Sequence, residues 1–228
     1  MAGWVVAVEG ASASGKSRTV ALARRTFGAT ALREAVDRLS PPPSFTWTSH
    51  VQLLRLERRL LAEDARRYRE ALRARANGDT VLADTGFLGP LTYTLGLVRS
   101  GTVPESVLSG LLTTARAWAR AGRWGLPDAI LYLRTPLAER QRRAEGDPRG
   151  HPTLLQRRHQ SIAAEELRFY RRVVAPAFGP RFRFVSGLGA PEEVVARVAR
   201  AVEATRAPSP RPTVAPLLRA LDHPKGVP

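Results

Sequence analysis

The chain has no cysteine, one methionine and four histidines among its 228 residues. The absence of cysteine excludes disulfide bonds and thiolate metal sites, and so few histidines disfavour a metal site built from imidazoles. No run of about 18 apolar residues is present, so we expect no membrane-spanning helix. The N-terminus also lacks the basic segment that begins a signal peptide. We therefore expect a cytoplasmic protein, long enough for one α/β domain with its own hydrophobic core.

Lysine is nearly absent: it occurs only at Lys16 and Lys225, and arginine supplies the remaining basic residues. Lys and Arg together number 36 against 20 acidic residues, which gives a formal net charge of +16. A charge of this size raises the question of a nucleic-acid partner. Much of it lies in LRLERRLLAEDARRYREALRAR, residues 54–75, where opposite charges three or four positions apart predict a solvated helix face. The excess therefore favours attraction to small anions such as nucleotides over a nucleic-acid surface.

Short apolar runs alternate with longer amphipathic segments along most of the chain. The runs are rich in valine and leucine, which is typical of strands buried on both faces of a parallel sheet. This alternation predicts a three-layer α/β fold, with a central parallel sheet of about five strands, helices on both faces and right-handed crossovers. The expected strands are 4–9, 29–33, 80–84, 129–134 and 182–186, and the expected helices are 16–27, 49–76, 88–99, 104–121, 153–173, 191–204 and one that follows a Thr135 cap.

The composition changes at about residue 207. Residues 1–206 are expected to form the folded domain. Residues 207–228 contain proline at short intervals and are expected to be extended or disordered. Within them, PLLRAL, residues 216–221, is apolar enough to dock on the domain, although nothing in the sequence indicates where.

A glycine-rich loop, GASASGKS, joins the first expected strand to the first expected helix. Its Gly-x-x-x-x-Gly-Lys-Ser spacing is that of a P-loop, and the flanking strand and helix supply the required context. Small residues let backbone N–H groups close around phosphate oxygens, and the helix N-terminus adds its positive dipole end. The pattern predicts a P-loop NTPase fold that binds ATP. The residues expected to bind it are Gly10, Ser12, Ser14, Gly15, Lys16 and Ser17, with Lys16 also acting in catalysis at the β and γ phosphates.

Asp84 ends the expected strand TVLAD, at the carboxyl edge of the sheet where ligands of such folds bind. From that position its carboxylate could hold Mg²⁺ together with the Ser17 hydroxyl. A plain aspartate in a turn is the alternative. The chain has no Asn-Lys-x-Asp motif for guanine recognition, which argues against a GTPase.

Two further acids, Glu34 and Asp37, follow the second expected strand in REAVDRL. A carboxylate in this place could accept the proton of a substrate hydroxyl during phosphoryl transfer. The alternative is that both acids lie on a solvent-facing helical turn.

These pieces, taken in order, resemble the deoxynucleoside kinases and, more distantly, thymidylate kinase. Members have a Glu before the P-loop, as Glu9 is here, and a catalytic Glu in Glu-Pro-Val-x-x-Trp, which Glu34-Ala35-Val36 matches at Glu and Val but not at Pro. The resemblance covers residues 3–204 and implies an ATP- and Mg²⁺-dependent kinase for a nucleoside or nucleoside monophosphate. The acceptor residues that it implies are Glu34 and the base-binding Gln52. Trp47, in the loop before Gln52, is aromatic and could stack on a nucleobase or be plain core, and Arg55 is a further expected acceptor residue.

The same resemblance implies an arginine-rich lid after the strand 129–134, which clamps the transferred phosphate. Guanidinium groups suit this role because they meet phosphoryl oxygens with two donors. The chain departs from the family at Thr85, where the family has an arginine that helps to hold the acceptor. The lid candidates are Arg140, Arg142, Arg143 and Arg149, with Arg143 expected in catalysis and Arg140 and Arg149 in nucleotide binding; Gly187-Leu188-Gly189 is the expected adenine loop.

A second resemblance leaves the acceptor open. The segments VDRL, residues 36–39, and DTGFLG, residues 84–89, are similar to segments of chloramphenicol phosphotransferase, another P-loop kinase. This alignment makes Asp37 the base and an antibiotic-like alcohol the acceptor. A nucleic-acid-binding or regulatory P-loop ATPase is the third alternative. The apolar side of the 49–76 helix could form a homodimer, or it could be covered by the 104–121 helix.

Overall fold

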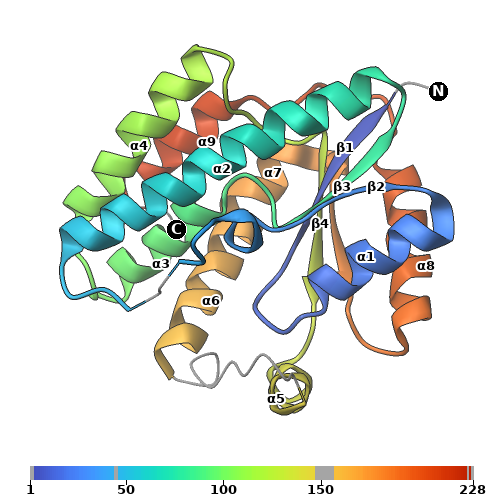
Figure 1. The fold of residues 1–228 in the computed structure, drawn as a ribbon, viewed down its shortest axis with the longest axis horizontal. Helices are drawn as coiled ribbons and strands as arrows, with labels where there is room; N and C mark the ends of the chain where they lie inside the picture. The colour runs from blue at the N-terminus through green and yellow to red at the C-terminus, as the bar shows by residue number, and fades with distance from the viewer. Residues whose placement is uncertain (1–2, 44–45, 147–156, 225, 227–228) are drawn as a thin grey trace.

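The computed structural model describes residues 3–43, 46–146, 157–224 and 226. Its centre is a sheet of five strands, all parallel, as the alternating sequence pattern predicts (Figure 1). The strand order means that β1 lies in the middle of the sheet, between β3 and β4. Across the sheet the strands are β2 (Thr30–Leu32), β3 (Thr80–Asp84), β1 (Trp4–Glu9), β4 (Ala129–Arg134) and β5 (Phe182–Ser186).

Each face of the sheet is covered by helices, because alternate side chains of the strands point to opposite faces. On one face, Val6 and Val8 of β1 pack with residues of α1 (Lys16–Phe27) and α8 (Pro191–Ala204). On the other face, Val5 and Ala7 belong to a larger core that is closed by the remaining helices. These are α2 (His50–Ala76), α3 (Gly89–Arg99), α4 (Glu105–Arg120), α6 (Arg157–Phe169), which continues into a π-helical turn (Tyr170–Val174), and α7 (Ala175–Phe178).

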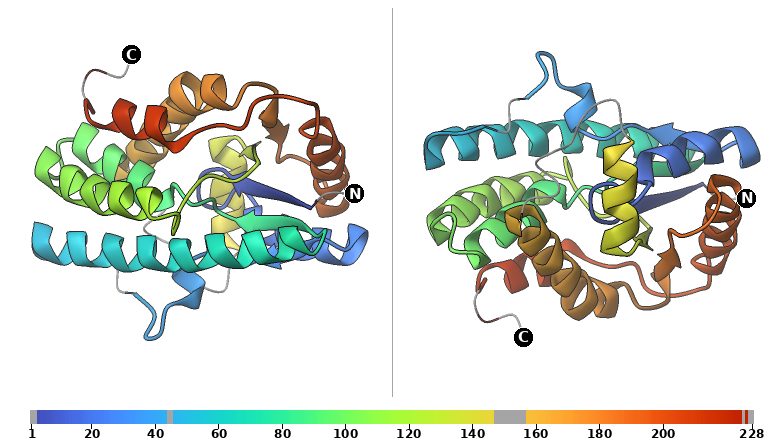
Figure 2. Two further views of the ribbon diagram at one scale, coloured as in Figure 1. Left: turned by 90° about the horizontal axis from the view of Figure 1, so that it is seen from above. Right: turned by 90° about the horizontal axis from the view of Figure 1, so that it is seen from below.

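The expected homodimer helix, α2, is packed within the chain. It lies against α4, and α4 lies between α2 and the C-terminal helix α9 (Val214–Leu221) (Figure 2). The 104–121 segment therefore covers part of α2, and a homodimer through α2 stays a prediction. No helix in the described part of the chain is long and apolar enough to cross a membrane.

The prediction of a solvated charged face on α2 is wrong for four of its residues. Glu57, Glu63, Asp64 and Arg67 are buried, at 1%, 4%, 1% and 0% exposure. The spacing of Glu57, Asp64 and Arg67, seven and three positions, places these three on one side of the helix, and that side faces the sheet. Val51, expected on the apolar side, is 58% exposed.

The prediction of a Thr135 cap is also wrong. The short helix α5 (Leu137–Glu145) begins after Pro136, which occupies the cap position and offers no side-chain hydrogen bond. The Thr135 hydroxyl donates instead to the backbone carbonyl of Ser14, at 3.0 Å. The hydroxyl is thus used to join the end of β4 to the glycine-rich loop.

The proline content of the tail predicts an extended or disordered segment, but part of the tail is helical. The helix α9 buries Leu217, Leu218 and Leu221, three leucines that share one helical face. Arg116 of α4 donates to the Leu218 carbonyl at 3.2 Å and pairs with the Asp222 carboxylate. The PLLRAL segment therefore docks on α4 and extends the core beyond residue 206.

We expect Leu217→Ala to lower the free energy of unfolding by about 2–5 kcal/mol, because it removes a fully buried leucine and leaves a cavity. Chemical denaturation of the full chain measures this loss. Leu137→Ala, at a leucine that is 38% exposed, is the matched control and should cost under about 1 kcal/mol. Equal stability of the two variants would contradict docking of the tail.

Candidate functional site

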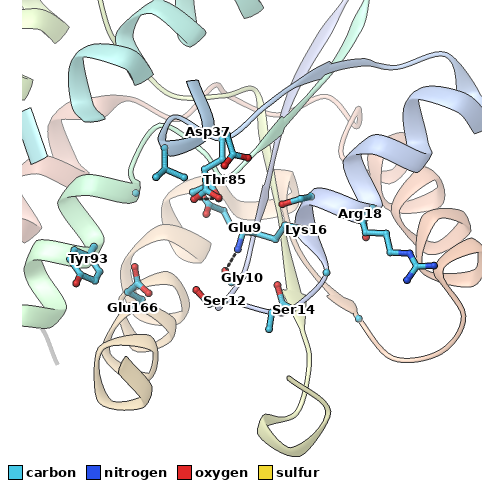
Figure 3. Close-up of a pocket in the computed structure, with 18 of the residues that line it drawn as sticks. Glu9, Gly10, Ser12, Ser14, Lys16, Arg18, Asp37, Thr85, Tyr93 and Glu166 are labelled. Carbon is cyan, nitrogen blue, oxygen red and sulfur yellow. Dashed lines mark hydrogen bonds between the residues drawn. The ribbon is translucent and has the colours of Figure 1, made fainter. Parts of the chain in front are cut away.

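A cavity of about 990 Å³ opens at the carboxyl edge of the sheet. Its walls come from the glycine-rich loop, the segment after β2, the inner side of α2, the start of α3, α5, α6 and the loop after β5. Figure 3 shows the loop at the centre of this cavity, with Tyr93 of α3 and Glu166 of α6 on one side of it. The position is the one that parallel α/β sheets use for ligands.

The loop has the backbone of a phosphate cradle. Gly10 lies at φ 144° and Gly15 at φ 99°, both conformations that favour glycine, and Ala13 lies at φ 60°. A Cβ at Gly10 would lie 2.8 Å from the Leu133 carbonyl oxygen, so β4 also leaves no room for a side chain there. Left-handed residues that alternate with ordinary ones turn successive N–H groups toward a common point, which is where an anion binds.

Lys16, the first residue of α1, folds over this loop. Its ammonium group donates to the Gly10 carbonyl at 2.9 Å (dashed line in Figure 3). The ammonium is thus held above the cradle, within the cavity, next to the carboxylates of Glu9 and Asp84. Burial raises the pKa values of both carboxyls, and the Lys16 charge opposes that rise. This geometry agrees with the P-loop prediction for Lys16.

The outer part of the loop is fixed by contacts from the residue that follows β4 and from α5. The Ser14 carbonyl accepts hydrogen bonds from the Thr135 hydroxyl and from Nη1 of Arg143, at 3.0 and 2.9 Å. Nη2 of Arg143 donates to the Gly187 carbonyl at 2.8 Å, and its Nε donates to Glu139 at 2.8 Å. Arg143 therefore links α5, the glycine-rich loop and the loop after β5.

Asp84 and Ser17 form the candidate metal site. Asp84 is 3% exposed, and its Oδ1 has no hydrogen-bond partner among the described residues. Burial raises the pKa of Asp84, while Lys16, the neighbouring Ser17 hydroxyl and Arg67 act in the opposite direction. An unpaired carboxylate oxygen beside a hydroxyl and a phosphate cradle fits Mg²⁺, which prefers oxygen ligands and uses few protein groups when phosphates supply others.

The chain turns sharply after Asp84. Thr85 lies at φ 57°, which a β-branched residue rarely adopts, and its hydroxyl donates to Oε1 of Glu34 at 3.1 Å. The next N–H, of Gly86, donates to Oε1 of Glu9 at 2.9 Å. A Cβ at Gly86 would lie 2.3 Å from that oxygen, so only glycine fits. The turn thereby directs two carboxylates, Glu9 and Glu34, to the edge of the cavity.

A buried arginine of α2 holds this turn in place. Nη1 of Arg67 pairs with Oδ1 of Asp64 at 2.5 Å, and Nη2 donates to the carbonyls of Asp84 and Thr85 at 2.6 and 2.8 Å. The guanidinium is therefore in contact with the backbone of position 85 itself. We call these contacts, between Arg67, Asp64 and residues 84–85, the arginine clamp.

The far end of the cavity is rich in carboxylates. Glu57 and Asp64 reach it from α2, and Glu166 reaches it from α6, where Oε1 accepts from the Thr92 hydroxyl at 3.2 Å. Burial raises the pKa of Glu57 to about 8, with Asp64 and Glu166 adding to the effect. Burial likewise raises the pKa values of Asp64 and Glu166 to about 7. These carboxyls lie close enough to oppose one another's ionisation.

The cavity brings together most of the residues expected from the sequence. The expected adenine loop contributes Gly187 and Gly189 to the lining, and Asp84 contacts the Ser17 hydroxyl. The other expected residues that line the cavity are Gly10, Ser12, Ser14, Gly15, Lys16, Ser17, Glu34, Asp37, Trp47, Arg142 and Arg143.

Three of the expected residues that the structure describes are not brought into it. Gln52 and Arg55 are exposed. The side-chain oxygen Oε1 of Gln52 accepts hydrogen bonds from the backbone N–H and the hydroxyl of Thr48. At about 100° per residue, Gln52 lies roughly 140° around α2 from Glu57, which does face the cavity. Arg140 is half-buried beside Tyr132, outside the lining, and its pKa is lowered by burial. Arg149 lies outside the described residues.

Sequence reasoning missed Glu57, Asp64, Arg67 and Glu166. A signal was present for the first three, because they recur at seven and three positions on the same side of the helix as Leu53, Leu60 and Leu61. Charged residues at apolar positions of a helix are typical of a buried site. Glu166 gives a similar signal, because it stands four positions after Ile162 and three before Phe169, both of which are buried.

No protein-family model matches this chain, and no curated protein matches its sequence. Solved structures do match its fold. Deoxyadenosine kinase from M. mycoides with bound dATP aligns at TM-score 0.70 and 13% identity, over 87% of this chain and 99% of that one. The same enzyme with bound dCTP aligns at TM-score 0.58 and 15% identity, over 87% of this chain and 98% of that one. Thymidylate kinase from Candida albicans aligns at TM-score 0.60 and 17% identity, over 90% of this chain and 92% of that one. At these identities the likeness shows the fold, and it confirms the P-loop kinase fold expected from the sequence.

The raised pKa of Glu57 predicts how stability depends on pH. The folded chain keeps this proton up to about pH 8, whereas the unfolded chain loses it near the ordinary value of 4.5. The stabilisation is therefore complete below pH 4.5 and is lost as the pH rises through 8. The free energy of unfolding of the parent chain should fall between pH 5.5 and pH 8.5. In Glu57→Gln, whose side chain cannot ionise, we expect this fall to be smaller by about 1–3 kcal/mol.

Denaturant unfolding at the two pH values measures this difference. The matched control is Glu70→Gln on the same helix, since the Glu70 carboxylate is half-exposed and pairs with Arg38 outside the cavity. If Glu57→Gln and the parent chain lost the same stability between the two pH values, Glu57 would be ionised in the folded state, contrary to this expectation.

Proposed function

We propose that this protein is a P-loop kinase, which transfers the γ-phosphoryl group of ATP to a hydroxyl of a small molecule. Nucleosides are the first acceptors to test, followed by natural-product alcohols. The observation that carries the proposal is one continuous cavity in which a phosphate cradle with its lysine meets a carboxylate, Glu34, held at the turn after β3. The solved structures of similar fold, deoxyadenosine kinase and thymidylate kinase, support it.

The donor end would act by positioning and by neutralising charge. The N–H groups of the glycine-rich loop and the Lys16 ammonium would hold the phosphates, as P-loops do. Ser17 and Asp84 would hold Mg²⁺, whose charge offsets that of the phosphoryl group during transfer. Arg142, exposed at the cavity and paired with Glu139, and Arg143 supply guanidinium groups at the same end.

The acceptor end would supply the general base. In the transfer, the acceptor oxygen forms a bond to the γ-phosphorus, the bond to the β–γ bridging oxygen breaks, and ADP leaves with that electron pair. The hydroxyl proton passes to a carboxylate, and we assign this role to Glu34. It is half-buried, fixed by Thr85 and adjacent to Asp84, whereas Asp37 is exposed on a 3-10 turn.

The alternatives from the sequence receive less support from the geometry. The acidic lining beyond the loop would repel the phosphates of a polynucleotide, which argues against nucleic acid as the acceptor. A regulatory ATPase without an acceptor would have no use for a cavity that extends well past the phosphate cradle.

We expect Lys16→Ala to lower acceptor-dependent ADP release at least about 100-fold, because the ammonium that offsets phosphate charge is removed. A coupled assay with ATP, Mg²⁺ and a panel of nucleosides measures this. Arg24→Ala, at an exposed arginine in the last turn of α1, is the control and should retain activity. Full activity of Lys16→Ala would argue against phosphoryl transfer at this loop.

We expect Glu34→Gln to lower kcat by about 10²–10⁴, the usual contribution of a general base. Asp37→Asn, which removes a carboxylate three positions away, should lower it by less than about tenfold. Single-turnover measurements with saturating acceptor compare the two. A larger loss for Asp37→Asn would transfer the base to Asp37 and favour the chloramphenicol phosphotransferase alignment.

A further inference from the structure

The two ends of the cavity differ in charge. Around the glycine-rich loop the lining carries four basic side chains and one acid. Beyond the loop, where the acceptor would bind, the described lining carries six acids and one base. The first set is Lys16, Arg18, Arg142, Arg143 and Glu139; the second is Glu9, Glu34, Asp37, Glu57, Asp64, Glu166 and Arg67.

The single base of the acceptor end is already occupied. The Arg67 guanidinium pairs with Asp64 and donates hydrogen bonds to the carbonyls of Asp84 and Thr85. It therefore neutralises Asp64 and leaves Glu57 and Glu166 without a cation, since neither takes part in an ion pair within the described part of the chain. This local charge is opposite to the net charge of +16 of the whole chain.

Glu57 is the clearest sign that a ligand is expected. Its side chain lines the cavity but is 1% exposed, and neither Oε1 nor Oε2 has a hydrogen-bond partner among the described residues. A buried carboxyl without partners is costly, and native proteins rarely keep one without use. Glu166 approaches from α6, on a different wall, and contributes to the raised pKa of Glu57.

We propose that the acceptor is a cationic alcohol, whose protonated amine binds between Glu57 and Glu166 while its hydroxyl faces Glu34. Amino sugars, aminocyclitols and amino-substituted nucleosides belong to this class. An ammonium group carries up to three donors, which match carboxylate oxygens that lack partners. A nucleoside monophosphate is disfavoured, because its phosphate would meet six acids there, and the single arginine of the described lining at this end is already paired. This inference rests on the proposed kinase function and specifies its acceptor.

Isothermal titration of matched compound pairs tests the inference without requiring turnover. The protein is loaded with Mg²⁺ and a non-hydrolysable ATP analogue, and each amine is compared with its neutral counterpart. The pairs are glucosamine and glucose, an aminocyclitol and inositol, and 3′-amino-3′-deoxyadenosine and adenosine. We expect at least one amine to bind ten or more times more tightly than its counterpart, and Glu57→Gln to reduce that ratio below threefold.

Two controls separate charge from structure. Glu70→Gln, outside the cavity on the same helix, should keep the ratio of the parent chain. In the parent chain, a bound ammonium should lower the pKa of Glu57, which is raised by burial to about 8. Binding at pH 7 should therefore release protons, seen as a binding enthalpy that differs between phosphate and MOPS buffers. For an amine that stays protonated over the range, affinity should rise from pH 6 to pH 8. This second measurement does not depend on the stability of a variant.

The outcomes distinguish the two proposals. Neutral counterparts that bind as tightly as the amines, or a preference that persists in Glu57→Gln, would overturn the cationic acceptor, while ADP release with those neutral compounds would still support the kinase. Failure of every amine to bind also counts against the inference. Tight amine binding without ADP release would support the cationic site and count against the kinase.

Discussion

The arginine clamp is the constraint on which the site depends. Arg67 is fully buried, so its guanidinium is held against Asp64 and the two carbonyls with little competition from water. Breaking a buried pair by removing one partner is costly, because the other charge stays buried and unpaired. The clamp thus fixes the end of β3, and with it Thr85, the contact from Thr85 to Glu34, and the position of Asp84 beside Ser17.

The clamp also explains how the chain accommodates threonine at position 85, where the resembling family has arginine. A guanidinium still contacts this part of the backbone, but it is supplied by Arg67 of α2, eighteen positions before Thr85 in the chain. Arg67 contacts the carbonyls from behind the turn and is paired with Asp64. It therefore acts on the architecture of the turn, and the space in front of Thr85 is left to the carboxylates.

Much of this molecule follows from its sequence. Valine-rich runs and glycine spacing are local patterns, and they predicted the five strands and the glycine-rich loop between the first strand and the first helix. The acceptor end was not predictable in the same way, because Glu57, Arg67 and Glu166 meet only after α2 and α6 pack on the sheet. Gln52 was assigned by its order in the family pattern, and a rotation of α2 by a fraction of a turn decides which side chain faces inward. Likewise, proline content predicts an open tail, whereas three leucines on one face of α9 determine that it docks.

The uneven charge of the cavity has a consequence for the end of a catalytic cycle. A phosphate monoester carries about −1.5 to −2 charges at neutral pH. Delivery of that group would turn a ligand attracted by Glu57 and Glu166 into one that those same side chains repel. The pocket would then hold its product less firmly than its substrate, so escape of the phosphorylated molecule would be quick and its accumulation would inhibit only weakly. Such a site favours flux in one direction even when product is abundant.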